Sequence, residues 1–297
     1  MLDAIKARPE SKFWMLIIVL NMRKFKLLNI VSFFIGTFIL TWIFWSLPLL
    51  YKFGYVTSLP SWWGLGGFAP SLVGILTVFL TNGKEEVKLL FIRIIKFKSS
   101  LALYSFVVLL PVALIASTLL ISKLVFDISF DWSKLPDAYL IPILFIQILL
   151  LGGPLNEELG WRGFALPALL ERINALSASL IIGLIWAVWH LPLFFAEIPG
   201  YTSMPFLSYL LNVISLSIIF THVYQKGGHQ LWLCILLHAI FNTTNWLLIP
   251  LMPEEKTLLI TSIYVFLTVM TAILIVVKNK QEFINTERQG FLETINN

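Results

Sequence analysis

The sequence predicts an all-α integral membrane protein, a polytopic bundle of about eight transmembrane helices. Of its 297 residues, 58% are hydrophobic and only 12% are charged, and its mean hydropathy is +0.87. An ordinary soluble domain carries about 25% charged residues, so the composition excludes that class. Tryptophan and tyrosine flank several apolar runs, as in the interfacial belt of membrane proteins. The one cysteine, Cys234, lies in an apolar run, which excludes an internal disulfide and a thiolate-rich metal cluster.

The chain opens with a basic segment, residues 1–26. Within it, Phe13–Leu20 is apolar but too short for the ~20 residues that a spanning helix needs. We therefore expect this stretch to be an interfacial helix on the membrane surface. The basic residues of the segment are Lys6, Arg8, Lys12, Arg23, Lys24 and Lys26.

Uncharged runs of spanning length then recur along the chain. Each is near the ~20 residues required to cross a bilayer as a helix. An even number of spans places both termini on one side of the membrane. The predicted spans are Leu27–Leu50, Leu59–Leu80, Leu101–Ser122, Tyr139–Leu155, Ser177–Phe195, Pro205–Tyr224, Leu231–Leu251 and Thr257–Val277.

The distribution of Lys and Arg predicts cytoplasmic termini. With that orientation, 17 of the 21 fall in the N-terminal segment, the loops 81–100, 156–176 and 225–230, and the tail 278–297, as the positive-inside rule requires. We attribute the net charge of +5 to this topology, and expect no nucleic-acid partner. The 81–100 loop either lies on the anionic inner leaflet or is a solvated connection. No repeat or linker divides the chain, so residues 1–297 are predicted to form one domain.

The chemistry is expected around Glu157, Glu158 and Arg162, which follow the fourth predicted span directly. Ionisable groups at membrane depth are expensive and usually mark function. Glu158 and Arg162 are four residues apart, so a helix makes them neighbours that can pair. Glu157 lies about 100° around the helix and cannot share that arginine equally. This asymmetry predicts a structural ion pair beside a free carboxylate.

Two further places put polar groups inside predicted spans. His238 and Asn242 are four residues apart and therefore project from one helix face. By helix rise, His238 lies ~10 Å below the cytoplasmic surface and His190 about 15–20 Å. We expect these residues to meet Glu157 in a cavity open to the cytoplasm, with Trp186 and Trp189 lining its wall. Taken singly, an intramembrane histidine is commonly a hydrogen-bonding group between helices.

A free glutamate beside imidazoles in a low-dielectric pocket suits the activation of water. Burial raises the pKa of a carboxyl group toward neutrality, where it works best as a general base. A His and Asn pair on one face supplies donors for a developing oxyanion. The predicted reaction is hydrolysis of an amide bond in the membrane without a cofactor. The alternative is a zinc site, since two His and one Glu form a known catalytic set, although no HExxH motif is present.

At these residues the chain resembles the CPBP intramembrane proteases, which include the CAAX prenyl proteases and the bacterial Abi and bacteriocin-immunity proteins. The resemblance covers roughly residues 139–245, the motif-bearing core. The family's second motif usually has Phe four residues before the histidine, where this chain has Trp186. The three matching motifs are Glu157-Glu158 with Arg162, Trp186 with His190, and His238 with Asn242.

The resemblance implies an eight-helix bundle and a metal-free glutamic endopeptidase. Its substrate would be a membrane-associated protein or peptide, and its location a bacterial cell membrane. The alternative is a non-proteolytic immunity or scaffold protein that uses the same fold. By resemblance, Glu157 would activate water with help from His190, His238 and Asn242 would form the oxyanion hole, and Glu158 and Arg162 would be structural.

Overall fold

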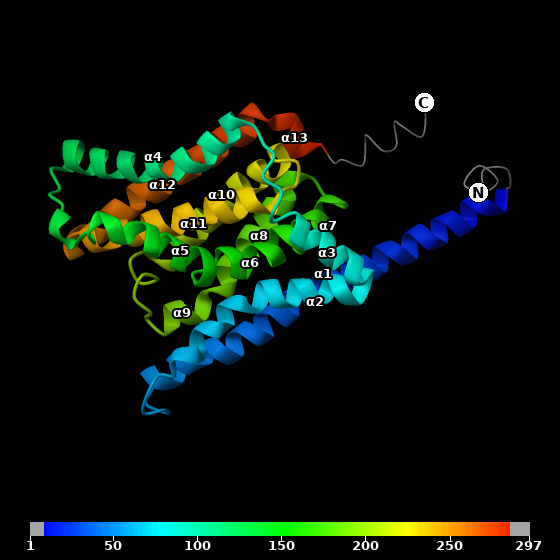
Figure 1. Cartoon of the computed structure of the whole chain (residues 1–297), viewed down its shortest axis with the longest axis horizontal. Helices are drawn as coiled ribbons and strands as arrows, with labels where there is room; N and C mark the ends of the chain where they lie inside the picture. Colours follow the sequence, from blue (N-terminus) through cyan, green and yellow to red (C-terminus); the bar gives the residue numbers. More distant parts are fainter. Residues whose placement is uncertain (1–8, 286–297) are drawn as a thin grey trace.

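The computed structural model describes residues 9–285, with side chains from residue 27 onward; residues 1–8 and 286–297 lie outside the description. Within the described residues the protein is helical and has no strand, and eight helical segments are long and apolar enough to cross a membrane. Figure 1 shows these segments packed as one bundle. The predicted fold class is confirmed.

The first helix, α1 (Pro9–Lys52), has 44 residues, about 66 Å at 1.5 Å per residue. This is roughly twice the thickness of a bilayer's hydrocarbon core. Figure 1 shows the part of α1 before the first span, Leu27–Lys52, extending away from the bundle. Residues 9–26 are thus continuous with the first span, and their predicted position at the membrane interface stays a prediction.

The other helices outside the centre of the bundle follow the predicted spans to within a few residues, and short helical turns connect them. The helix α4 begins after Ser100, whose side chain accepts a hydrogen bond from the Leu103 N–H at 3.2 Å, a common helix start. These elements are η1 (Ser61–Phe68), α2 (Ala69–Asn82), α3 (Lys84–Ile92), α4 (Leu101–Phe126), η2 (Trp132–Lys134), η3 (Ala138–Leu140), η5 (Ile249–Leu251), η6 (Glu254–Lys256), α12 (Thr257–Lys278) and α13 (Lys280–Ile284).

The fourth span departs from its prediction. It continues to Leu170, so the predicted end at Leu155 and the cytoplasmic loop 156–176 are wrong. Hydropathy failed here because the charges of Glu157, Glu158 and Arg162 break the apolar run, although they are buried inside the bundle. The span consists of α5 (Ile141–Leu151), α6 (Pro154–Gly160), a π-helical turn η4 (Trp161–Ala165) and α7 (Leu166–Leu170).

Three helices form the centre of the bundle: α8 (Ala175–Trp189), α10 (Phe206–Lys226) and α11 (Leu231–Leu248). Half or more of each of these spans is buried, against less than a third for the spans of α1, α2 and α4. The short helix α9 (Leu191–Phe195) follows α8. A Cβ added at Gly183 would lie 2.6 Å from the Ile214 Cα, so this glycine allows the close approach of α8 and α10.

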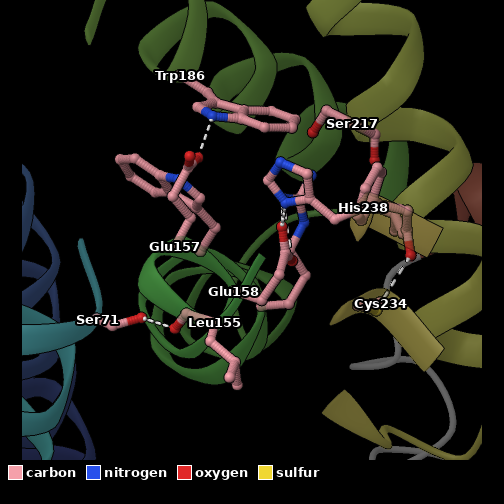
Figure 2. A network of polar contacts seen from close by, with 12 residues as sticks. Ser71, Leu155, Glu157, Glu158, Trp186, Ser217, Cys234 and His238 are labelled. Carbon is pink, nitrogen blue, oxygen red and sulfur yellow. Dashed lines mark hydrogen bonds and ion pairs between the residues drawn. The ribbon is translucent and has the colours of Figure 1, made fainter. Parts of the chain in front are cut away.

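The helix α6, which carries the two glutamates, is held against α2. A Cβ added at Gly160 would lie 2.2 Å from the Pro70 carbonyl oxygen, and one at Gly74 would lie 2.9 Å from the Gly160 Cα. Ser71 donates a hydrogen bond to the Leu155 carbonyl at 2.8 Å (Figure 2). Small residues let the two backbones meet, and this contact fixes the position of α6.

Candidate active site

A break in the helix of the fourth span positions the residues of the candidate active site. The helix α5 ends at Leu151, and α6 starts with Pro154 in its first turn, where the missing N–H of proline costs no hydrogen bond. Between them, Gly153 has φ +117°, a backbone region that favours glycine. The break redirects the chain so that the first turn of α6 carries Glu157.

Glu157 is only 6% exposed, and one of its oxygens is fixed by two indoles. Its Oε2 accepts hydrogen bonds from Trp186 Nε1 at 2.7 Å and from Trp161 Nε1 at 3.2 Å. Figure 2 shows the two carboxylates leaving α6 in different directions, Glu157 toward Trp186 and Glu158 toward His238. The two donors orient the Glu157 carboxylate, and no hydrogen-bond donor to its Oε1 is found among the residues that the structure describes.

That free oxygen meets two further polar atoms beside Gly153. A Cβ added to Gly153 would lie 2.8 Å from Glu157 Oε1, 3.3 Å from His238 Nε2 and 3.3 Å from Asn242 Nδ2. Asn242 Nδ2 also donates to the Gly152 carbonyl at 2.9 Å, which fixes the amide against the helix break. A carboxylate oxygen, an imidazole nitrogen and an amide nitrogen thus converge on space that only glycine leaves open.

Glu158 and Arg162 form the expected ion pair, and both side chains have no exposure. Arg162 Nη1 donates to Glu158 Oε1 and Oε2 at 2.9 and 3.2 Å. The guanidinium lies between Trp186 and Phe220, at 4.7 and 4.2 Å from the ring centroids, positions that favour cation–π attraction.

Glu158 has a second partner, which the sequence analysis missed. Its Oε1 lies 2.7 Å from His238 Nδ1, so the carboxylate orients the imidazole and directs Nε2 toward Glu157. A ligand histidine or catalytic histidine is commonly held in this way through its other nitrogen. Glu158 therefore links the buried arginine to the histidine of the third motif.

His190 joins the site through the carbonyl of Trp186. Its Nδ1 lies 2.9 Å from that oxygen, which fixes Nδ1 as the donor and leaves Nε2 as an acceptor. The ring packs against Trp189, Tyr201 and Tyr209, with centroids 4.5, 5.5 and 5.5 Å away. Trp186 thus binds Glu157 through its side chain and His190 through its backbone.

Glu157, His190, His238 and Asn242 all line one cavity of about 530 Å³. Trp186 lines it as predicted, whereas Trp189 does not. Trp189 is fully buried, and its Nε1 donates to Thr41 Oγ1 at 2.7 Å, so it joins α8 to α1. The cavity wall also includes Leu144, Gln147, Gly200, Ser203, Asn212, Leu216, Trp246, Leu248, Ile249, Met252, Thr261 and Tyr264.

The cavity extends from Glu157 toward the bundle end at which α10 and α12 begin. Its lining includes residues of α5, the 196–205 connection, α10 as far as Phe220, α11 from His238 onward and the first turns of α12. The sequence predicts the termini and the cavity mouth on the same side of the membrane. The lining residues at the start of α10 and α12 lie at the face opposite the end of α12 (Figure 1).

Comparisons with known proteins find similarity in the segment that carries these site residues. Residues 139–244 match the family described as Type II CAAX prenyl endopeptidase Rce1-like. The chain is also 27% identical over 241 residues to "CAAX prenyl protease 2" of Methanococcus maripaludis, covering 73% of this chain and 83% of the relative. The matched residues carry the helix break, both glutamates and both histidines of the cavity. The chain is therefore similar to CAAX proteases over this segment.

These similarities confirm the resemblance seen in the motifs. Together with the eight apolar helical segments of the described residues, they indicate an integral, multi-pass membrane enzyme, an intramembrane endopeptidase. Among the described residues, no group of three His, Cys, Asp or Glu is arranged to hold a metal ion.

Several contributors to this site were missed in the sequence. Trp161 lies four residues after Glu157, so helical spacing could have identified it as a neighbour. The Gly152-Gly153-Pro154 run inside an apolar stretch is a signal for a helix break. Tyr201 and Tyr209 carried no such signal, because they reach His190 through the tertiary structure.

Adding a single methyl group at Gly153 tests whether the polar atoms that converge beside it are needed for cleavage. We expect Gly153→Ala to lower cleavage by at least about tenfold, because its Cβ would lie 2.8 Å from Glu157 Oε1 and strained backbone costs roughly 1–3 kcal/mol. Gly54→Ala is the matched control, since Gly54 also has positive φ but has nothing within 4 Å of the added Cβ. Cleavage rates and thermal denaturation in detergent measure both variants. Equal activity in the two would contradict the proposed convergence.

Proposed function

We propose that this protein is a CAAX-type protease, which hydrolyses a peptide bond in a membrane-associated protein or peptide by a metal-free, glutamic mechanism. The observation that carries the proposal is the convergence of Glu157 Oε1, His238 Nε2 and Asn242 Nδ2 beside Gly153. Low dielectric and fixed geometry make such groups effective in catalysis. The expected location is a bacterial cell membrane with the termini in the cytoplasm.

Glu157 acts as the base in the proposed first step. Its Oε1 takes a proton from a water molecule, and the water oxygen bonds to the carbonyl carbon of the substrate. The electron pair of the C=O bond moves to oxygen, where Asn242 Nδ2 and His238 Nε2 donate hydrogen bonds. For Nε2 to donate, the His238 ring must carry both protons, and the Glu158 carboxylate on Nδ1 is the counterion of that form.

The intermediate then collapses, and the carbon–nitrogen bond breaks. The proton held by Glu157 passes to the leaving nitrogen, so that one water is consumed and Glu157 returns to the carboxylate. His190, with its Nδ1 bonded to the Trp186 carbonyl, offers Nε2 as a further acceptor for the attacking water. Glu158 and Arg162 act by position, since neither is exposed.

The substrate is expected to bind the apolar wall of the cavity. The printed name of the Methanococcus relative adds prenylated CAAX peptides as a candidate class, beside native membrane peptides without a lipid. Both classes would bury apolar surface against Leu144, Leu216 and Leu248, which is favourable on transfer from water.

A membrane peptidome compares these possibilities. The chain and its Glu157→Gln variant are expressed in a host without relatives, and membrane peptides are identified by mass spectrometry with and without a chelator. Prenylated CAAX peptides are added as a separate arm. We expect fragments that depend on Glu157 and persist with the chelator.

Each other outcome is informative. Fragments lost on chelation would favour the zinc alternative over the glutamic mechanism. Identical peptidomes, together with an immunity assay that Glu157→Gln passes unchanged, would favour a non-proteolytic immunity or scaffold protein. Cleavage that persists in Glu157→Gln would refute the role of Glu157 as the base.

A further inference from the structure

The cavity is closed toward the bundle end at which α12 ends. Behind Glu157 lie Glu158, Arg162 and Trp161, and each is 0% exposed. The α3 region covers them in turn, since Leu90 is 2% exposed and a Cβ added at Gly163 would lie 2.7 Å from its Cδ1. No lining residue lies beyond this layer.

The connection after α3 reinforces the closure. Arg93 donates to the carbonyl oxygens of Gly163 and His229 at 3.3 and 3.0 Å, and to the Tyr224 hydroxyl at 2.8 Å. The Leu231 N–H donates to the Arg93 carbonyl at 3.0 Å. The predicted 81–100 loop is thus an ordered cover that joins the fourth, sixth and seventh spans. It blocks a route into the site from this end.

A substrate can reach Glu157 from the opposite end of the cavity. Gly200 and Ser203 of the 196–205 connection, Ile249 and Met252 at the end of the seventh span, and Leu144 of α5 line the cavity there. All of these positions lie at the bundle end where the even-numbered spans begin. A substrate that reaches Glu157 through this cavity must therefore enter at that end.

The charge distribution assigns that end to a side of the membrane. Among the Lys and Arg of residues 9–285, only four lie at the mouth end: Lys52, Lys123, Lys134 and Lys256. Arg162 lies inside the bundle, and the other 13 belong to segments on the side of the opposite end. Because Lys and Arg concentrate in cytoplasmic segments, the mouth faces away from the cytoplasm.

We propose that the candidate active site opens to the non-cytoplasmic face of the membrane and takes an uncharged, apolar peptide segment presented there. The substrate class rests on the proposed function, whereas the side of entry does not. The expectation of a mouth open to the cytoplasm is replaced, and the expectation of cytoplasmic termini is kept.

The lining chemistry supports an uncharged peptide segment. Among the described residues, Glu157 is the one Asp, Glu, Lys or Arg of the cavity lining, so a charged segment would have no counterion along the wall. Asn212 lines the wall at 6% exposure, and its Oδ1 has no hydrogen-bond partner among the described residues. A peptide N–H of the substrate would satisfy this acceptor, as a buried polar atom requires.

Cysteine labelling tests the side of entry without any cleavage. In a Cys234→Ala background, Thr202→Cys places a thiol on the exposed connection beside the mouth, Leu216→Cys places one inside the cavity, and Lys96→Cys places one on the exposed opposite end. Membrane-impermeant thiol reagents are applied to spheroplasts and to sealed inverted vesicles. We expect Thr202→Cys and Leu216→Cys to react in spheroplasts, and Lys96→Cys to react in inverted vesicles.

The chain supplies its own negative control. Native Cys234 is 0% exposed and does not line the cavity, so the unmodified protein should react in neither preparation. Reaction of Thr202→Cys only in inverted vesicles would overturn the orientation. Reaction of Leu216→Cys only in inverted vesicles, or in neither preparation, would overturn the route. Because labelling needs no turnover, an inactive protein with the expected pattern would contradict the proposed function alone.

Discussion

Replacing Glu157 by glutamine is expected to lower cleavage roughly 10³-fold or more, because general bases contribute up to about 10⁴-fold. That loss corresponds to about 4 kcal/mol of transition-state stabilisation. The amide keeps the size of the carboxylate and can still contact the two indoles that bind Oε2, so thermal denaturation in detergent should change little. Initial rates on a substrate found in the membrane peptidome measure the effect.

A matched variant separates the effect of the position of the Glu157 carboxylate from the effect of its charge. Glu157→Asp keeps the carboxylate but withdraws it by one methylene from the Gly153 opening, and we expect an intermediate loss of activity. The same rate for Glu157→Asp and Glu157→Gln would favour a purely geometric role. Wild-type activity in Glu157→Gln would rule out the glutamic mechanism.

Replacing Glu158 by glutamine is expected to destabilise the fold by about 3–5 kcal/mol, the usual cost of leaving a buried charge without its partner. Arg162 would keep its charge at 0% exposure, with aromatic rings as its remaining neighbours. His238 Nδ1 would also lose its carboxylate. Detergent denaturation and cleavage rates measure the two consequences separately.

The double variant Glu158→Leu/Arg162→Met is the control for this prediction. It removes both charges at similar volume, and such replacements of buried ion pairs are often neutral or stabilising. We expect it to recover most of the stability but little of the activity, because His238 still lacks the group that orients its ring. A double variant with wild-type activity would contradict the assigned link between Glu158 and His238.

The membrane architecture was predictable because its causes are local in sequence. Apolar runs of about 20 residues are required by the thickness of the bilayer, and residues 9–285 include eight helical segments that are long and apolar enough to cross it. The ion pair between Glu158 and Arg162 was predictable for the same reason, since helical geometry makes residues four apart neighbours. The error at Leu155 arose because hydropathy cannot recognise charges that are neutralised inside a span.

The arrangement of the site depended on contacts between distant segments. His238 lies 80 residues from Glu158, and Trp186 lies 29 residues from Glu157. No periodicity links such positions, because packing between helices decides which faces meet. The motif order indicated which residues belong together, but not that each glutamate has a separate set of partners.

The sequence by itself determined that this chain is a multi-pass helical protein, and it predicts which side of the membrane its charged segments favour and which residues carry its chemistry. Composition, charge bias and motif spacing are properties of the chain before it folds. Only the tertiary structure decided that Gly153 brings Glu157, His238 and Asn242 together, and that the cavity extends toward the end at which α10 and α12 begin. Both depend on the break before α6 and on the cover formed by α3, which arise from packing between segments far apart in the sequence.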